Sequence, residues 1–206
     1  MSLAPADARA FERCIADGGV ALFPADTVYG VACDPSSAAA VARLYALKGR
    51  PAEKPAAVMF FALEPALAAL PELGPRTRAA LAALLPGALT LLLPNSRGRF
   101  PLACGPDPGT LGLRVPALPE PIAALGDVGV AVLQSSANRA GGPDARTLDA
   151  VPRAIRDGAG LVLDGGEVGG VASTVVDLRG YEDGGGWSVL REGAAARATL
   201  AATLGG

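Results

Sequence analysis

Short, uninterrupted apolar runs recur along the chain and restrict its fold more than any other feature. We predict strands over residues 20–23, 56–63, 88–93, 111–115, 128–133, 161–164, 174–178 and 187–191. The runs are apolar at consecutive positions rather than at alternate ones, which indicates strands that are buried on both faces. Segments with helical periodicity separate several of these strands. The pattern predicts an α/β fold with a sheet covered by helices on at least one face.

Capping residues place the helices between these strands. We predict helices over residues 7–17, from Ser36 or Ser37 to Gly49, from Pro75 to Pro86, and after Thr147. Ser and Thr cap helix starts, Pro suits the first turn, and Gly ends a helix. Residues 24–30 are expected to form a loop and the last residues a short helix. No internal repeat or domain boundary is visible, so we expect one domain over residues 1–206.

The chain contains no histidine, which excludes several kinds of active site. Ser-His-Asp catalysis, Cys-His catalysis and His-ligated zinc all require imidazole. The three cysteines are far apart and form no CxxC pair, which favours reduced thiols and a cytoplasmic protein. The apolar runs are too short to cross a bilayer. Chemistry must therefore rest on positioning, on cationic and backbone electrostatics, on a carboxylate or on a bound metal.

The only two lysines, Lys48 and Lys54, lie in one seven-residue stretch together with Arg50. An ammonium group is a point charge that suits a single phosphate oxygen. Pro51 keeps Arg50 out of the helical conformation, so Lys48 and Arg50 can face one triphosphate. Alternatively, these cations gather because a helix C-terminus attracts them. On the first interpretation Lys48 is a solvated cavity cation, and its removal abolishes the chemistry without unfolding the protein.

Three other polar segments follow or connect predicted strands, which is where α/β proteins bind ligands. In residues 24–30, an extended backbone would place Thr27 and Tyr29 on one side; alternatively Tyr29 is core and Thr27 a turn residue. Residues 134–138 offer the Ser136 hydroxyl and the Asn138 amide, both also common in loops. The glycine-rich residues 164–174 permit close backbone approach to a ligand. Neither GxxxxGK[ST] nor GxGxxG occurs in the chain.

Arg114 lies in a predicted strand among apolar neighbours, where an unpaired charge is unfavourable. A substrate carboxylate would be one partner, held by two parallel hydrogen bonds. A structural ion pair with an Asp or Glu is the alternative. The net charge of −2 means that any RNA binding needs a local basic patch.

Seven motifs, taken in order, resemble the YrdC-like family of threonylcarbamoyl-AMP synthases. They are PADTVYG at 24–30, KGRPAEKP at 48–55, PGALTLLLP at 86–94, TLGLRVP at 110–116, SSAN at 135–138, ASTVVDL at 172–178 and LREGA at 190–194. The resemblance runs from about residue 8 to 195. It implies a twisted mixed α/β sheet with packed helices and a large concave, basic ligand cavity. It also implies the single-domain form, without the C-terminal domain of longer relatives.

The resemblance implies a nucleotidyltransferase that converts L-threonine, bicarbonate and ATP into threonylcarbamoyl-AMP and pyrophosphate. The product would feed the threonylcarbamoyl modification of tRNA adenosine through other proteins of that pathway, and direct tRNA contact is not required. ATP and Mg²⁺ are implied, the metal being held through the ATP phosphates, with no organic prosthetic group. The alternative is a nucleotide- or RNA-binding protein of the same fold without synthase activity.

The family's functional positions can be carried over onto this chain. The resemblance implies a catalytic set of Lys48, Arg50, Ser136 and Asn138. It implies threonine contacts at Thr27, Arg114, Ser136 and Ser173, and ATP contacts at Lys48, Arg50, Lys54, Thr110, Asn138, Arg146 and Arg191. The chain departs from the family pattern at Ala25, Met59, Arg139-Ala140 and Glu192; Met59 stands where longer relatives place a substrate-binding histidine. These departures concern threonine selectivity more than the ATP site.

Overall fold

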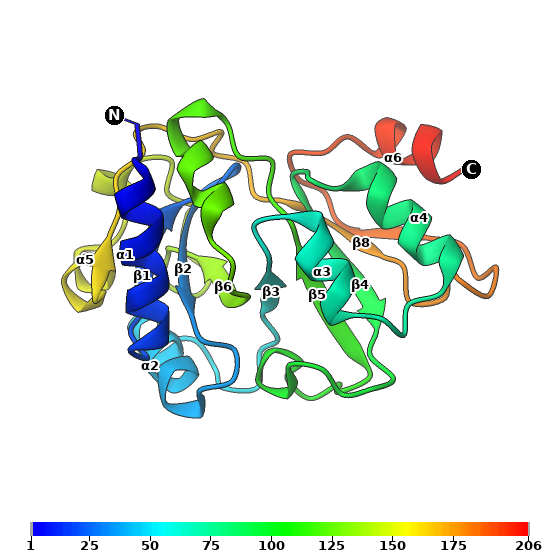
Figure 1. Cartoon of the computed structure of the whole chain (residues 1–206), viewed down its shortest axis with the longest axis horizontal. Coiled ribbons are helices and arrows are strands. Elements are labelled where there is room, and N and C mark those ends of the chain that lie inside the picture. Colours follow the sequence, from blue (N-terminus) through cyan, green and yellow to red (C-terminus); the bar gives the residue numbers. More distant parts are fainter. Residues whose placement is uncertain (1, 206) are drawn as a thin grey trace.

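Nine strands form one twisted mixed sheet in the computed structural model of the chain, which describes residues 2–205 (Figure 1). The strand order is β7-β1-β2-β6-β3-β5-β4-β8-β9. The pairs β1–β7, β3–β5 and β4–β8 are parallel and the others antiparallel. The strands are β1 (Ala21–Pro24), β2 (Tyr29–Cys33), β3 (Ala57–Met59), β4 (Leu89–Pro94), β5 (Thr110–Arg114), β6 (Val132–Ser136), β7 (Leu161–Val162), β8 (Thr174–Asp177) and β9 (Ser188–Arg191).

The helices connect these strands, and several begin and end where capping residues predict. The α-helices are α1 (Pro5–Ala16), α2 (Ala38–Lys48), α3 (Leu63–Ala69), α4 (Pro75–Leu84), α5 (Arg153–Gly158) and α6 (Arg197–Leu204). The 3₁₀ helices are η1 (Pro101–Ala103), η2 (Glu120–Asp127) and η3 (Leu148–Ala150). Ser37 caps α2 by accepting a hydrogen bond from the Ala40 N–H at 3.2 Å. Gly49 ends α2 in the left-handed conformation, with φ of 57°.

Apolar side chains pack on both faces of the sheet, which explains the continuous apolar runs. On one face, a row of paired residues belongs to the larger core: Cys33, Leu133, Val58, Leu113, Leu91 and Val176. Helices α2, α3, α4 and α6 cover that face. The other face carries a smaller core under α1 and η2, where Phe11 meets Phe23 and Phe61 edge to face. The predicted fold class is confirmed.

Four predicted element boundaries are wrong. The loop expected over 24–30 ends early, because β2 begins at Tyr29. The strand expected over 56–63 stops at Met59, since Leu63 already begins α3. The strand expected over 128–133 lies later in the chain, because η2 extends to Asp127. Thr147 caps the 3₁₀ helix η3, and α5 begins only at Arg153.

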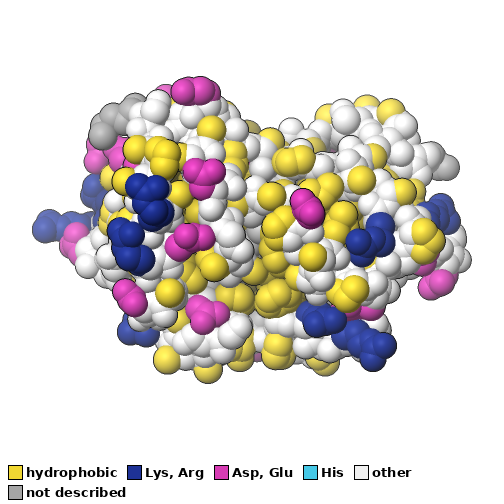
Figure 2. Space-filling view, viewed as in Figure 1, with side chains coloured by type: hydrophobic (Ala, Val, Ile, Leu, Met, Phe, Trp, Pro, Cys, Tyr) yellow, Lys and Arg dark blue, Asp and Glu magenta, His cyan; other side chains and the backbone are white. Residues whose placement is uncertain are grey.

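In the part of the chain that the structure describes, no helix is both long and apolar enough to traverse a bilayer. On the face that Figure 2 shows, acidic and basic side chains are interspersed, and apolar side chains fill the depression between the two sides of the molecule.

Candidate active site

A cavity of about 690 Å³ opens on the sheet face that α1 and η2 cover only in part. Its floor follows one row of paired residues across four strands, namely Gln134, Ala57, Gly112 and Leu92. The small residues Ala57 and Gly112 keep this floor low. All seven motifs contribute lining residues. Six residues of the whole lining are basic, namely Lys48, Arg50, Lys54, Arg114, Arg179 and Arg191, and all but Arg179 belong to the motifs. The concave basic cavity expected from the resemblance is therefore present.

Lys48 ends helix α2 beneath one end of this cavity, and it is not solvated. The residue is 1% exposed. Its ammonium group donates to the backbone oxygen of Ser136, to that of Asn138 at 2.6 Å and to Asn138 Oδ1 at 3.2 Å. These three acceptors occupy all three donors of the ammonium group. The expectation of a solvated cation is therefore wrong. Because Lys48 holds the Ser136–Asn138 segment in place, we expect its loss to lower stability.

Ser136 and Asn138 are joined to each other as well as to Lys48. The Ser136 hydroxyl lies 2.6 Å from Asn138 Oδ1, and Asn138 Nδ2 donates to the Gly142 carbonyl. Both residues line the cavity. The predicted i, i+2 relation thus brings a hydroxyl and an amide to one place. Ser136 ends strand β6 rather than following it, so the segment is more rigid than the loop that the sequence suggests.

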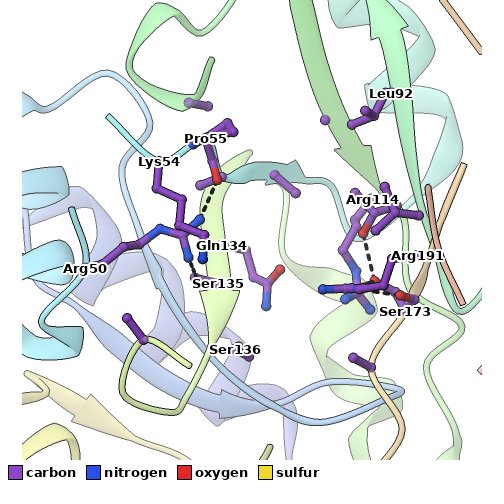
Figure 3. Close-up of a pocket in the computed structure, with 18 of the residues that line it drawn as sticks. Arg50, Lys54, Pro55, Leu92, Arg114, Gln134, Ser135, Ser136, Ser173 and Arg191 are labelled. Atoms are coloured by element: carbon purple, nitrogen blue, oxygen red, sulfur yellow. Dashed lines mark hydrogen bonds between the residues drawn. The ribbon is translucent and has the colours of Figure 1, made fainter. Parts of the chain in front are cut away.

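Arg50 and Lys54 lie side by side at this end of the cavity (Figure 3). Arg50 Nη2 donates to the Pro55 carbonyl and Nη1 to Ser135 Oγ at 3.4 Å. The guanidinium group also lies 5.5 Å from the centre of the Tyr45 ring. These contacts fix Arg50 on the cavity wall, whereas Lys54 is exposed. The two cations are positioned to face one anionic ligand.

Burial of the Lys48 ammonium group predicts a pH-dependent stability. Desolvation, and then the nearby Arg50 charge, lower the pKa of Lys48 from 10.5 to about 8. The unfolded chain therefore binds more protons than the folded chain between these two values, and stability rises with pH across that window. We expect the wild-type protein to gain stability relative to Lys48→Met from about pH 8 to 10.5. Urea unfolding of both proteins at several pH values measures the difference, and a constant difference contradicts the assignment.

Arg114 occupies the opposite end of the cavity and pairs with Asp26. Arg114 Nη2 lies 2.7 Å from Asp26 Oδ1 and 3.2 Å from Thr27 Oγ1. Both charged side chains are 5% exposed. Asp26 Oδ2 also accepts from the Ala117 N–H, while Arg114 Nε is buried without a partner among residues 2–205. Burial raises the pKa of Asp26, and the Arg114 charge and the Ala117 N–H oppose that rise. The structural ion pair left open by the sequence is present.

Ser173 and Arg191 extend this end of the cavity. Arg191 Nη2 donates to the Ser173 carbonyl at 2.8 Å and to its hydroxyl at 3.3 Å. Ser173 Oγ lies 2.8 Å from Thr90 Oγ1. Figure 3 shows Arg191 next to Ser173 and Arg114. Arg191, expected among the ATP contacts, therefore lies beside two of the residues expected to bind threonine, Ser173 and Arg114.

Two other expected ATP contacts differ in their placement. Thr110 lines the cavity and donates to Asp107 Oδ2 at 2.6 Å, while Arg179 Nη1 lies 3.2 Å from its hydroxyl. Arg146 instead pairs with Glu167 at 2.8 Å, and its side chain is 58% exposed. Arg146 is not among the lining residues, so a role in ATP binding requires its side chain to turn inward.

The glycine-rich segment packs against the PADTVYG motif. Tyr29 is fully buried, and its hydroxyl donates to Asp164 Oδ1 at 2.9 Å or to the Gly166 carbonyl at 2.8 Å. The Gly170 N–H donates to the Thr27 carbonyl at 2.6 Å. The alternative in which Tyr29 is a core residue is therefore confirmed. Thr27 is also buried, and it contacts Arg114.

Three of the departures from the family pattern lie outside the lining of the cavity. Ala25 and Met59 are buried in the smaller core, and Glu192 is exposed at the surface. Met59 follows the cavity floor residue Ala57 by two residues in β3 and pairs with Arg114 in register. A methionine there contributes to the packing of the smaller core.

Sequence reasoning missed several polar residues that line the cavity: Thr90, Asp107, Gln134, Asp144 and Arg179. Gln134 was detectable, because side chains at i and i−2 of a strand share a face and Ser136 was already singled out. Arg179 follows the ASTVVDL motif directly, but its sequence context resembles an ordinary surface turn. Residues 2–205 contain no group of three or more Cys, Asp or Glu placed to hold a metal ion.

Comparisons with known proteins agree with this geometry. The family model Sua5_yciO_yrdC, described as Telomere recombination, matches residues 13–193. A threonylcarbamoyl-AMP synthase of Nitrosococcus oceani is 35% identical over 153 residues, which cover 74% of this chain and 82% of the relative. A threonylcarbamoyl-AMP synthase of Chromobacterium violaceum is 36% identical over 164 residues, covering 79% of this chain and 83% of the relative.

Solved structures show the same fold. The crystal structure of P. abyssi Sua5 complexed with L-threonine superposes with a TM-score of 0.86 at 27% identity, covering 100% of this chain. The chain spans 59% of the length of that Sua5. E. coli YciO superposes with a TM-score of 0.75 at 21% identity over 97% of this chain and 100% of its own. The family match, the sequence identities and the shared fold agree, and the chain belongs to the Sua5/YciO/YrdC family.

Proposed function

We propose that the cavity is the active site of an L-threonylcarbamoyladenylate synthase, a nucleotidyltransferase that uses L-threonine, bicarbonate and ATP. The observation that carries this proposal is the meeting of all seven motifs in one basic cavity. Relatives at 35% and 36% identity bear the name threonylcarbamoyl-AMP synthase, and a structural neighbour is complexed with L-threonine. The product serves the threonylcarbamoyl modification of tRNA adenosine.

The reaction suits a chain without histidine. The threonine amine attacks the carbon of bicarbonate and water leaves, which gives a carbamate. A carbamate oxygen then bonds to the α-phosphorus of ATP, the bond from that phosphorus to the bridging oxygen breaks, and pyrophosphate leaves with the electron pair. Every partner except the amine is an anion, so the protein has to align them and offset their repulsion. The six lining cations provide charge of the required sign.

Two ends of the cavity divide the substrates between them. ATP lies against Arg50 and Lys54, next to Ser136, Asn138 and Thr110. L-threonine lies at the other end, where Ser173 offers a hydroxyl group and Arg114 a guanidinium group. Thr27 is buried outside the cavity lining and acts there through its contact with Arg114. Lys48 acts through the Ser136–Asn138 segment, and Arg191 acts at the threonine end through its contacts with Ser173.

Mg²⁺ would be held here through the phosphates of bound ATP. The acidic residues that line the cavity are Asp107 and Asp144, and oxygen ligands of this kind suit Mg²⁺. When bound, the ion would offset negative charge on the phosphates. We propose further that the chain acts in the cytoplasm as one YrdC-like domain over residues 1–206, and that other tRNA threonylcarbamoylation proteins consume its product.

Pyrophosphate release tests the proposal directly. Purified protein with ATP, Mg²⁺, bicarbonate and L-threonine is expected to release pyrophosphate and to form an adenylate that contains the threonyl group. Omission of either threonine or bicarbonate should reduce release to the background rate, because neither the carbamate nor its adenylate can then form. Equal release with and without threonine contradicts the synthase assignment. ATP binding without any release would support the alternative of a nucleotide-binding protein of the same fold.

A further inference from the structure

Gln134 is the only glutamine in the chain, and its amide lines the cavity without a hydrogen-bond partner among residues 2–205. The residue is 4% exposed and lines the cavity from the middle of β6. Among residues 2–205, no hydrogen bond joins the amide to another group, since its polar neighbours bond elsewhere: Ser135 to Arg50, and Ser136 to Asn138. Neither amide atom is among the fully enclosed side-chain atoms that lack a partner in residues 2–205, so the amide faces the cavity, where a bound ligand can satisfy its donors and its acceptor.

The surroundings of Gln134 fix where its amide lies. Gln134 pairs with Ala32 on one side and with Ala57 on the other, and neither alanine offers a polar side-chain atom. The amide packs over Gly30, where an added Cβ would lie 2.9 Å from Nε2. A side chain at Gly30 would therefore displace the amide. The absence of a side chain there leaves a fitted space for Gln134.

The position of Gln134 is central to the reaction. Figure 3 shows Gln134 between Arg50 and Lys54 on one side and Arg114 and Arg191 on the other. The proposed reaction joins the threonine amine to the α-phosphate through a single carbon atom that comes from bicarbonate. That carbon must therefore lie between the two ends of the cavity. Within the floor row of Gln134, Ala57, Gly112 and Leu92, Gln134 alone has a polar side chain.

We infer that Gln134 binds bicarbonate and the carbamate formed from it. A primary amide presents an N–H donor and a carbonyl acceptor side by side in one plane. Bicarbonate presents an O–H donor and an oxygen acceptor in the same arrangement, so two parallel hydrogen bonds join them. After carbamate formation, Nε2 donates to a carbamate oxygen. This inference rests on the proposed function and adds the residue that holds the one-carbon substrate.

Three variants at this position test the inference. Gln134→Leu removes both hydrogen-bonding groups at similar volume, Gln134→Asn withdraws the amide by one methylene, and Gln134→Glu places a carboxylate beside the anion. Pyrophosphate release is measured as a function of bicarbonate concentration with ATP and threonine saturating. It is then measured as a function of ATP, and of threonine, with the other two substrates saturating. We expect kcat/KM for bicarbonate to fall about 10- to 100-fold in Gln134→Leu, as for loss of hydrogen bonds to a charged group. We expect kcat/KM for bicarbonate to fall further in Gln134→Glu and less in Gln134→Asn.

The KM values for ATP and threonine are internal controls, expected to stay within about twofold of wild type because both ligands bind mainly at the cavity ends. Wild-type activity with an unchanged kcat/KM for bicarbonate in Gln134→Leu overturns the inference alone. An equal loss of kcat/KM for all three substrates, in a variant with a wild-type thermal melt, also overturns the inference. A wild-type protein without bicarbonate-dependent release overturns the inference together with the proposed function. If Gln134→Leu does not fold, the same kinetic comparison is made with Gln134→Asn.

Discussion

Replacing Lys48 with alanine is expected to lower threonine-dependent pyrophosphate release by at least about 100-fold, as a displacement of about 1 Å near reacting groups can do. The loss arises because the Lys48 ammonium group holds the Ser136 and Asn138 carbonyls and Asn138 Oδ1. Without it, the segment that carries the Ser136 hydroxyl and the Asn138 amide into the cavity shifts. Buried oxygens left without a donor cost about 1–3 kcal/mol each, so the melting temperature should fall as well.

The second lysine provides a matched control for the effect on stability. Lys54 lines the same end of the cavity but is exposed, and its side chain forms none of the hydrogen bonds found among residues 2–205. Lys54→Ala should therefore keep the wild-type melting temperature. Lys48→Arg should resemble Lys48→Ala, because a planar guanidinium group cannot direct its donors to three converging oxygens. A Lys48→Ala variant with full activity, or with an unchanged thermal melt, would rule out this positioning role.

Replacing Asp26 with asparagine is expected to destabilise the protein by about 3–5 kcal/mol, the usual effect of leaving one charge of a buried pair without its partner. Arg114 has no other carboxylate within salt-bridge distance among residues 2–205. Asparagine keeps the shape of the side chain and can still accept from the Ala117 N–H. The loss of stability in Asp26→Asn therefore measures the contribution of the Asp26 charge rather than that of its packing. Thermal melts of the variant and the wild type measure it.

Addition of ligand to Asp26→Asn then distinguishes the two roles of Arg114. If Arg114 binds the substrate carboxylate, L-threonine supplies the missing negative charge and raises the melting temperature of the variant more than that of the wild type. L-threoninol, which lacks the carboxylate, should not do so. Equal shifts with threonine and threoninol would restrict Arg114 to its structural ion pair. ATP serves as the control ligand, because its proposed site lies at the other end of the cavity.

The sequence predicted the fold class well because continuous apolar runs and capping residues are local signals. Ser37 and Gly49 bound α2 as expected. Helix α3 escaped prediction because Ala62 provides no side-chain cap and the apolar run continues through residues 56–63. Strand β2 escaped prediction because only four residues separate it from β1, and residues 24–30 contain several turn formers. Local patterns do not distinguish such short elements from the loops around them.

The sequence predicted part of the candidate site's membership, missing Gln134 and Arg179 and including Arg146, and it did not predict the contacts. Motif positions named most residues that line the cavity, but the burial of Lys48 depends on acceptors about 90 residues away in the chain. The partner of Arg114 is Asp26, 88 residues away. Pairings over such distances arise from strand order, which periodicity does not encode. The same limit concealed Gln134, whose central place depends on β6 lying between β2 and β3.

That strand order also governs how the protein folds. The cavity floor takes neighbouring residues from β6, β3, β5 and β4, and β6 must insert between β2 and β3, which precede it by many residues. Chains dominated by such distant pairings have a high contact order and fold slowly. No partly assembled sheet contains the floor. A ligand on it therefore binds only the complete fold, and by mass action it slows amide exchange throughout the central strands rather than in one loop.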